Sequence, residues 1–555
     1  MGEAAVAPSP PDQPLTPDRA SSSRASRHHA TPVTETQGAP GAAGRPGART
    51  GLVSLAGLAL VGIGLRAWVM ASPLGYLNSD EAHTSIQARE LFRGHVWILV
   101  PGNPYGGNFE AWLDAPLAAL FGLSATRNKV EAGVFWLVAA LVLARSVRHL
   151  GRGPVAAAFG VLWLPSAALV LVSTLNYPGY PFGLVATCGA LALARPLLDN
   201  PPLDNPPAKR FPVVSWRAGA VGFLAGLAVW QHPLYGWVCG ATLAVLAWHQ
   251  RRRLARVIFP MAVGGIAALT PMVVANLRHD LLSLRFRSAP TEAYPDRVSA
   301  WIIDLYPRAM GARWRGPGWV DGRFSQAVAA LVLVLLVAVC LAVLRRSPLS
   351  GKVAAGTLLL APFVLTLLGN TSYTLDGRYA VMVLPAAALT LAHGVALLPR
   401  RWPTGLAVPF TVVAWAVLAV VVPFRDGIGT TLTEPEADLD QLVAFLDARQ
   451  ITAARADYWV AYRLVVRSDE RIAASPLAPV KFDRYEQRVR QADAMGAGVL
   501  VLETAQVAAY PTTTPPVDFP YSAFPQFQNH QRVAVGSWTV FLPPGTPAAP
   551  KTGRT

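Results

Sequence analysis

The sequence predicts a mainly α-helical protein that crosses a membrane many times and carries a small α/β domain at its C terminus. Three observations predict this class. Hydrophobic residues make up 52% of the 555 residues and charged residues only 14%, a balance typical of membrane proteins. Long apolar runs recur up to about residue 425. Beyond that point, short strands and amphipathic helices replace them.

The first 50 residues are rich in Ala, Pro, Ser, Thr and Gly and show no apolar period. Such a segment cannot bury enough apolar surface to fold, so we predict a disordered cytoplasmic tail over residues 1–50. The first apolar run begins near Leu52, too far along the chain for a signal peptide. It is long enough to remain in the membrane as a span.

A helix needs roughly 20 apolar residues to cross the hydrocarbon core of a bilayer. About eleven segments qualify, and together they define a membrane domain over residues 51–425. They lie near 52–72, 129–147, 154–174, 181–198, 217–231, 234–249, 257–275, 326–344, 353–369, 379–398 and 404–424. The fifth and sixth are short and separated by three residues, so one long broken helix is the alternative.

The arginines and lysines orient these spans. If the tail is cytoplasmic, every short inner loop is basic, as the positive-inside rule requires. Merging the two short spans would move the arginine cluster at 251–253 outside, so we keep them separate. The first loop (73–127), a long loop (277–325) and the C-terminal domain (426–555) then lie outside. The inner loops account for much of the net charge of +16, and no nucleic-acid binding is expected.

The C-terminal domain shows both helical and strand patterns. Leu439, Leu442, Val443 and Leu446 have helical spacing, and a second helix is expected over 482–495. Residues 471–475, 498–503 and 532–543 read as strands. We therefore predict a small extracytoplasmic α/β domain.

An acidic pair, Asp80 and Glu81, follows the first span, where carboxylates near lipid are costly. Asn78 can cap a helix whose third residue is Glu81, and Gly94 can end it. In one interpretation the two acids only complement the helix dipole, which stabilises the helix by about 1 kcal/mol or less. However, the same loop carries a third carboxylate, Glu110, before an amphipathic stretch that can lie in the membrane interface. Three carboxylates in one outer loop favour a functional site.

The order of these features resembles the first external loop of the GT-C glycosyltransferases. An Asp-Glu helix start is followed by ARELFRG with a Trp, a Tyr-x-x-x-Phe-Glu turn and an interfacial helix ending in Phe-Gly. The chain is most similar to protein O-mannosyltransferases and lipid A aminoarabinose transferases, in detail over 78–122 and loosely over 52–425. The resemblance implies an inverting glycosyltransferase that moves a sugar from a polyprenyl-phosphate donor to an extracytoplasmic protein, lipid or cell-wall glycan. Related enzymes often follow Phe-Glu with Lys-Pro, whereas Ala111-Trp112 stands here.

The resemblance makes Asp80 the catalytic base for the acceptor hydroxyl. A sugar carried on phosphate is already activated, so inversion needs one carboxylate to take the acceptor proton. Glu81 and Glu110 would then orient the donor or acceptor. Alternatively, Asp80 and Glu110 would hold a divalent cation, Mg²⁺ or Mn²⁺, because hard cations prefer oxygen ligands.

A phosphate leaving group calls for cations. Arg66 stands out as a charge inside an apolar span, and Arg378-Tyr379 opens a late span as an Arg-Tyr pair does in the resembled family. Both are candidate donor-binding sites, with snorkelling or interfacial anchoring as the alternative. His232, at a predicted outer hairpin, is a further candidate, although a lone histidine is more often structural.

A polytopic transporter or flippase of a lipid-linked or polysaccharide substrate is the alternative function. Transporters place ionisable groups near the membrane midplane, whereas the polar clusters here gather on the outer side. Ala-rich and Arg-rich usage hints at a GC-rich bacterial genome. We therefore expect a multi-pass protein of a bacterial plasma membrane, with its N terminus inside and its C-terminal domain outside.

Overall fold

The structure is a computed structural model that describes residues 46–200, 211–285, 292–313, 318–367, 377–399, 402–418, 435–477, 480–504, 527 and 529–546. The predicted disordered tail lies outside these residues except for its last five, which begin the first helix, α1 (Pro46–Met70).

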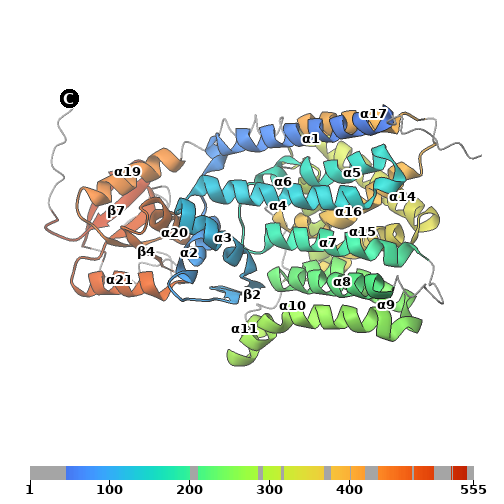
Figure 1. Ribbon diagram of the computed structural model, residues 1–555. Helices are drawn as coiled ribbons and strands as arrows, with labels where there is room; N and C mark the ends of the chain where they lie inside the picture. The colour runs from blue at the N-terminus through green and yellow to red at the C-terminus, as the bar shows by residue number, and fades with distance from the viewer. Residues whose placement is uncertain are drawn as a thin grey trace, which may run out of the picture. The chain divides into compact units, whose positions relative to one another are not determined.

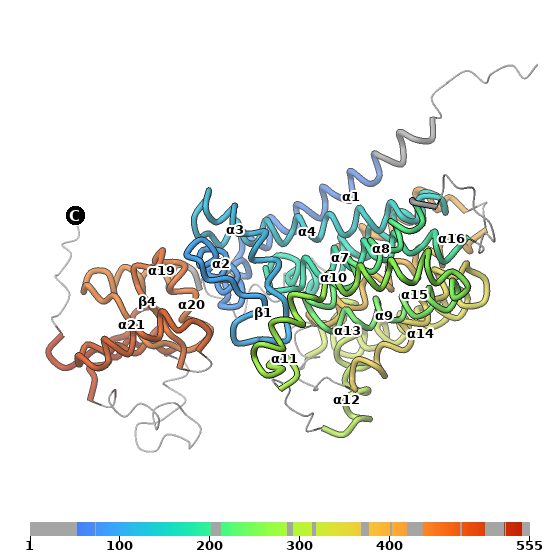
Figure 2. Tube along the Cα trace, turned by 60° about the horizontal axis from the view of Figure 1, so that its bottom comes forward, coloured from blue at the N-terminus to red at the C-terminus, as the bar shows by residue number. Residues whose placement is uncertain are grey.

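Helices of different lengths that lie side by side form the membrane part of the chain (Figures 1 and 2). Besides α1 they are α4 (Ala125–Ser146), α5 (Arg152–Trp163), α6 (Ala167–Val172), α7 (Tyr180–Asp199), α8 (Phe211–Gln231), α9 (Tyr235–His249), α10 (Phe259–Arg278), α14 (Gly322–Arg346), α15 (Leu349–Leu365), η8 (Arg378–Val383), α16 (Leu384–Ala396) and α17 (Thr404–Ala416). Short helical turns η2 (Arg148–Leu150), η4 (Arg251–Arg253) and η5 (Leu254–Ile258) connect some of them.

Each of the eleven predicted spans contains helix in its described residues. Among the described helices, six are long and apolar enough to cross a membrane: 53–70, 180–199, 213–231, 251–278, 322–346 and 378–396. The count of eleven therefore stays a prediction. The two short spans are the separate helices α8 and α9, joined by a turn at 232–234.

Glycine allows two of these helices to pack backbone to backbone. A Cβ atom at Gly222 of α8 would lie 1.8 Å from the carbonyl oxygen of Met261, and one at Gly264 of α10 would lie 2.1 Å from that of Gly219. Small residues at such crossings are how membrane helices gain contact area, because lipid gives them no hydrophobic driving force to associate.

The first loop folds into η1 (Pro73–Gly75), α2 (Ser79–Leu91), a hairpin of β1 (Leu99–Val100) and β2 (Asn103–Gly107), and α3 (Phe109–Phe121). The predicted cap of α2 is confirmed: the Asn78 side chain accepts from the Glu81 amide at 2.9 Å, and the Glu81 carboxylate accepts from the Asn78 amide at 3.2 Å. Gly94 lies in the turn after α2 with a φ of +85°. The long loop contains α11 (Leu282–Arg285), α12 (Tyr294–Ala300), η6 (Trp301–Leu305) and α13 (Tyr306–Ala309).

In its described residues, the C-terminal part forms a five-stranded sheet with three helices. Its elements are α19 (Pro435–Asp447), β3 (Ala453–Ala456), α20 (Tyr458–Arg467), β4 (Ala473–Pro476), α21 (Asp483–Ala494), β5 (Leu500–Glu503), β6 (Gln531–Val535) and β7 (Trp538–Leu542). The strand order is β4-β3-β5-β7-β6; β3 runs parallel to β4 and β5, and β7 antiparallel to β5 and β6. Residues 532–543 are thus a hairpin that turns at Gly536 rather than one strand.

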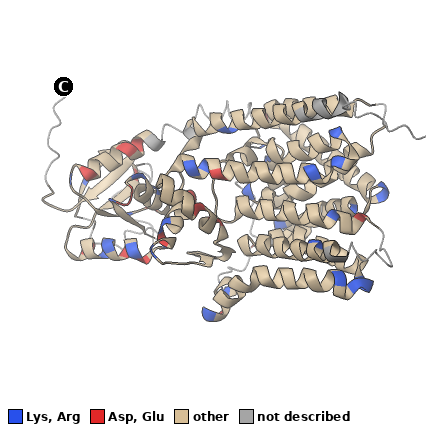
Figure 3. Cartoon of the chain, in the orientation of Figure 1, with Lys and Arg blue, Asp and Glu red and all other residues tan. Residues whose placement is uncertain are grey.

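The apolar core of this α/β region continues into the first loop. Ala82 and Ile86 of α2 are fully buried in the same cluster as Val460 and Leu464 of α20. Figure 1 shows α20 beside α2, and Figure 3 shows few charged residues along the middle of the membrane helices. The predicted class, a mainly α membrane protein with a small C-terminal α/β region, is confirmed. The docking of α20 on α2 also places residues of that region beside the acidic pair.

Candidate functional site

Asp80 lies where four parts of the chain meet. The hydroxyl of Tyr458, at the start of α20, donates a hydrogen bond to Asp80 Oδ1 at 2.5 Å. Lys481 Nζ lies 3.7 Å from the same oxygen, and the Arg378 guanidinium lies 3.8 Å from Oδ2. The last two distances exceed a hydrogen bond, so they describe charge pairs. We call Asp80, Tyr458, Lys481 and Arg378 the Asp80 cluster.

Local backbone contacts fix this arrangement. The Ser79 hydroxyl donates to the Tyr458 carbonyl oxygen at 2.5 Å, and the Asp457 side chain caps α20 by accepting from the Trp459 amide at 2.9 Å. The first turns of α2 and α20 are therefore held against each other. Burial raises the pKa of Tyr458, and the neighbouring Asp80 carboxylate raises it further, so Tyr458 is a neutral donor.

Glu81 points away from this cluster. Both of its carboxylate oxygens accept from Lys129 Nζ of α4, at 3.0 and 2.9 Å, and one also accepts from the Asn176 amide at 3.3 Å. Burial raises the pKa of Glu81, whereas Lys129 opposes that shift. These contacts support the capping role considered for Glu81, and its predicted contact with substrate stays a prediction.

Glu110 anchors α3 to the start of α7. Its carboxylate accepts from the Gly179 amide at 2.6 Å and from the Phe182 amide at 3.3 Å, and the residue is only 1% exposed. Burial raises its pKa to about 8, while the two backbone donors pull in the other direction. Each carboxylate oxygen of Glu110 thus accepts a hydrogen bond from a backbone amide, and these bonds join α3 to the start of α7. The predicted contact of Glu110 with substrate stays a prediction.

Aromatic rings surround the predicted cation Arg378. Its guanidinium lies 5.3 Å from the ring centres of both Tyr177 and Tyr379. The Tyr379 ring packs in turn against Tyr180 and His232. The structure therefore brings Arg378, Tyr379 and His232 into one group next to Asp80. Burial lowers the pKa of His232 to about 3, and Arg378 adds to the shift, so this ring is neutral.

Arg66 sits elsewhere in the fold. Its guanidinium donates to the carbonyl oxygens of Gly62 at 3.1 Å and Trp163 at 3.0 Å, and it lies 3.6 Å from the centre of the Trp163 ring. These contacts join α1 to α5. They also offset part of the cost of placing a charged side chain inside a membrane span, because the guanidinium bonds protein groups instead of facing lipid. The donor-binding role predicted for Arg66 stays a prediction.

Sequence reasoning missed the two lysines that face the acidic pair. The chain has only five lysines among 48 basic residues, and two of them, Lys129 and Lys481, are buried opposite Glu81 and Asp80. The small number of lysines could have drawn attention to these two positions. In an arginine-rich chain a retained lysine points to a specific role, because its compact ammonium and the planar guanidinium of arginine are not interchangeable. Glu131, also buried, lies with Lys129 at the start of a predicted span.

The carboxylates do not fit the predicted Mg²⁺ or Mn²⁺ site. In the part of the chain that the structure describes, no group of three or more His, Cys, Asp or Glu residues could hold a metal ion. Glu110 is engaged with backbone amides and Asp80 faces two cations. Two cations beside Asp80 favour the binding of an anion over that of a metal cation, so the proposed reaction uses no metal ion.

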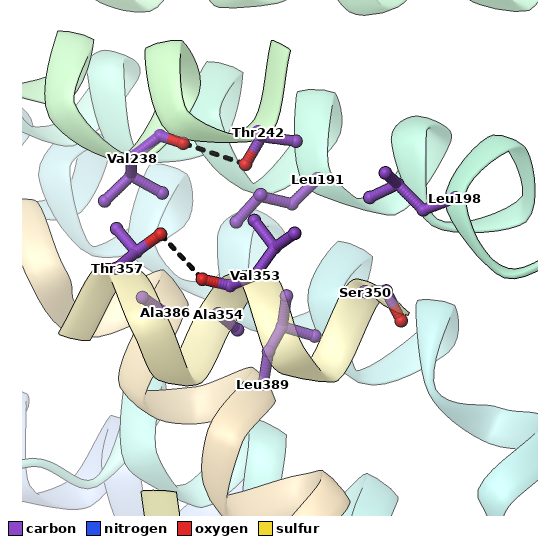
Figure 4. Close-up of a pocket in the computed structure, with 10 residues that line it drawn as sticks. All are labelled: Leu191, Leu198, Val238, Thr242, Ser350, Val353, Ala354, Thr357, Ala386 and Leu389. Carbon is purple, nitrogen blue, oxygen red and sulfur yellow. Dashed lines mark hydrogen bonds between the residues drawn. The ribbon is translucent and has the colours of Figure 1, made fainter. Parts of the chain in front are cut away.

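An apolar cleft of about 360 Å³ begins beside the residues that follow Arg378. It lies between α5, η8, α14, α16 and α17, and its lining includes Ala380, Val383, Leu384, Leu336 and Trp415. A second cavity, between α7, α9, α15 and α16, measures only about 10 Å³ (Figure 4). That volume holds about one water molecule, so this second cavity is too small for a ligand.

The structure is similar to solved membrane transferases. It matches ArnT from Cupriavidus metallidurans bound to undecaprenyl phosphate with a TM-score of 0.57 and 15% identity, over 88% of this chain and 97% of that one. The apo state of the same protein matches with a TM-score of 0.58 and 14% identity, over 89% and 98%. The archaeal oligosaccharyltransferase AglB from Archaeoglobus fulgidus gives 0.45 and 13%, over 82% and 69%. No protein-family model matches the sequence, and no curated protein does. The chain thus shares the fold of ArnT, in agreement with the resemblance noted for its first loop.

Proposed function

We propose that this protein is a membrane glycosyltransferase that moves a sugar from a polyprenyl-phosphate donor to an extracytoplasmic acceptor, with Asp80 as the general base. The observation that carries the proposal is the position of Arg378. It opens η8 beside Asp80, and the residues that follow it line the apolar cleft. A cation at the mouth of an apolar cleft suits a ligand with a phosphate head and a hydrocarbon tail.

The proposed reaction is a single displacement at the anomeric carbon. The acceptor hydroxyl oxygen forms the new bond to that carbon while the bond from carbon to phosphate oxygen breaks. The phosphate leaves with the bonding electron pair, and Asp80 takes the hydroxyl proton. The phosphate is a good leaving group already, so no general acid is needed, and attack opposite to it inverts the anomeric centre.

The fold match supports the lipid donor. The solved ArnT structure holds undecaprenyl phosphate, and this chain matches it along nearly its whole length. The sugar and the acceptor are the parts of the proposal that rest on chemistry alone: any acceptor must present a hydroxyl or a similar nucleophile to Asp80.

We also propose that the protein lies in a bacterial plasma membrane with the Asp80 cluster and the C-terminal region outside. The basic loops assigned to the inside support this orientation. A protease-sensitive tag at the C terminus should be cleaved when protease is added to intact spheroplasts, and a tag at the N terminus should be protected. The reverse pattern would overturn the orientation.

The test of the function is loss and restoration of a glycan. Mass spectrometry of cell-envelope glycans should show one sugar substituent lost when the gene is deleted and regained with the wild-type gene. Asp80→Asn keeps the side-chain shape but cannot take the proton, so it should not restore the substituent although the protein reaches the membrane in normal amounts. Full restoration by this variant would refute the base assignment. A transporter would instead show no sugar transfer in a purified preparation supplied with donor and acceptor.

A further inference from the structure

The C-terminal region contributes a buried lysine to the Asp80 cluster. The Lys481 side chain is only 1% exposed, and its ammonium donates a hydrogen bond to the Tyr458 hydroxyl at 2.5 Å. The ammonium also lies 4.7 Å from the centre of the Tyr458 ring. Removing an ammonium from water costs several kcal/mol, so a lysine in this position needs a compensating role.

Three contacts, two from α20 and one from the β1–β2 turn, hold Lys481 in place. Its backbone amide donates to the Tyr462 hydroxyl at 2.8 Å, and its ammonium binds Tyr458. Its stem packs on the turn between β1 and β2: a Cβ atom at Gly102 would lie 2.5 Å from Lys481 Cγ. Gly102 also has a φ of +74°, which favours glycine. The first external loop and the C-terminal region therefore position this ammonium together.

Positive charge from two elements lies beside Asp80. Among the described residues, Asp80 faces two cations, Lys481 and Arg378, whereas Glu81 binds Lys129. His83, one turn along α2, adds no charge, because burial holds its pKa well below the usual range. The Lys481 ammonium and the Arg378 guanidinium lie 3.7 and 3.8 Å from the two oxygens of Asp80, so an anion bound beside Asp80 would meet positive charge from both.

We propose that Lys481 is a donor-phosphate ligand supplied by the C-terminal region, which acts with Arg378 to complete the site. The inference rests on the proposed function, and it adds the point that the membrane helices alone do not form the full anion site. Two cations beside Asp80 favour the singly charged phosphodiester donor, and they favour the more strongly charged phosphate monoester product still more.

The test measures phosphate binding rather than catalysis. Purified protein in detergent is mixed with undecaprenyl phosphate, undecaprenol or inorganic phosphate, and the midpoint of thermal unfolding is followed as a function of ligand concentration. Wild-type protein should be stabilised by undecaprenyl phosphate far more than by either of the others. Lys481→Met removes the charge but keeps most of the stem packing, and it should weaken the apparent affinity about tenfold or more. Lys352→Met, at the first turn of α15, is the matched control and should bind like the wild type.

A second variant covers the case in which Lys481→Met fails to fold. Gly102→Ala leaves every charge in place but crowds the Lys481 stem, so it should also weaken undecaprenyl phosphate binding. Equal affinity in wild type and in the variant that folds would overturn the role of Lys481. Equal stabilisation by inorganic phosphate would overturn the lipid-phosphate assignment. If the wild type shows no response to undecaprenyl phosphate, the proposed function fails with it.

Discussion

Glu81 binds Lys129 through both carboxylate oxygens, at 3.0 and 2.9 Å, while its neighbour Asp80 faces a different lysine across the domain contact. Two consecutive acids therefore do different work. Glu81 closes the cap of α2 and ties it to α4, and Asp80 meets Tyr458, Lys481 and Arg378. Each carboxylate therefore has cations beside it, which offsets the cost of holding it near a membrane.

The Glu81 and Lys129 pair should be critical for stability because both side chains are buried. Removing one partner leaves the other charge without compensation, which costs about 3–5 kcal/mol. Glu81→Gln or Lys129→Met should therefore lower the thermal unfolding midpoint in detergent strongly. The double variant should be less destabilised than the sum of the two single ones. Single variants as stable as the wild type would contradict the pairing.

Arg378→Ala should weaken use of the lipid donor. Loss of a charged hydrogen bond to phosphate is worth about 1.5–3 kcal/mol, which corresponds to a rise in the donor KM of roughly tenfold to a hundredfold. The KM for the acceptor should change little. Arg323→Ala, at the start of α14, removes an exposed arginine and serves as the control. An unchanged donor KM in Arg378→Ala would rule out phosphate contact.

An ion-pair network holds α2 against the C-terminal region. Arg93 bonds both Glu90 and Glu470, and Arg484 donates to Glu90 at 2.7 Å. Because Glu90 and Glu470 are nearly buried, Arg93→Ala should destabilise the contact and slow sugar transfer without altering any residue of the Asp80 cluster.

The control for this variant is Asp469→Ala. Asp469 pairs with Arg89 at 2.8 Å, but its side chain is 68% exposed, so the pair should contribute less than about 1 kcal/mol. Transfer rates and unfolding midpoints of both variants can be compared in one preparation. Equal effects at the two positions would show that the buried network has no special role.

The same network predicts how stability depends on pH. Burial opposes ionisation of Glu470, but hydrogen bonds from Arg93 and Tyr485 outweigh it and lower its pKa to about 2. A depressed acid stabilises the fold above its unfolded pKa, which is about 4.5, and that stability is lost as the pH falls toward 2. Unfolding midpoints of wild type and Glu470→Gln should therefore differ at pH 6 and converge toward pH 2. A difference that stays constant with pH would contradict this.

The sequence alone determined the class of the fold and the local structure around Asp80 and Glu81. Apolar runs predict membrane helices because lipid leaves few other options for a backbone, and the cap at Asn78 and Glu81 follows from local hydrogen-bonding rules. The helix through Leu439 and Leu446 follows from its period in the same way. These features depend on residues close together in the chain.

Only the tertiary structure decided which charges meet. It paired Lys129 with Glu81 and brought Lys481 and Tyr458 to Asp80. No local pattern encodes such contacts, because they arise when α20 docks on α2 to bury a shared apolar core. The packing of the other helices gave Glu110 and Arg66 their own backbone partners, at the start of α7 and in α5, since the place of a charged side chain is set by the partners that the fold supplies.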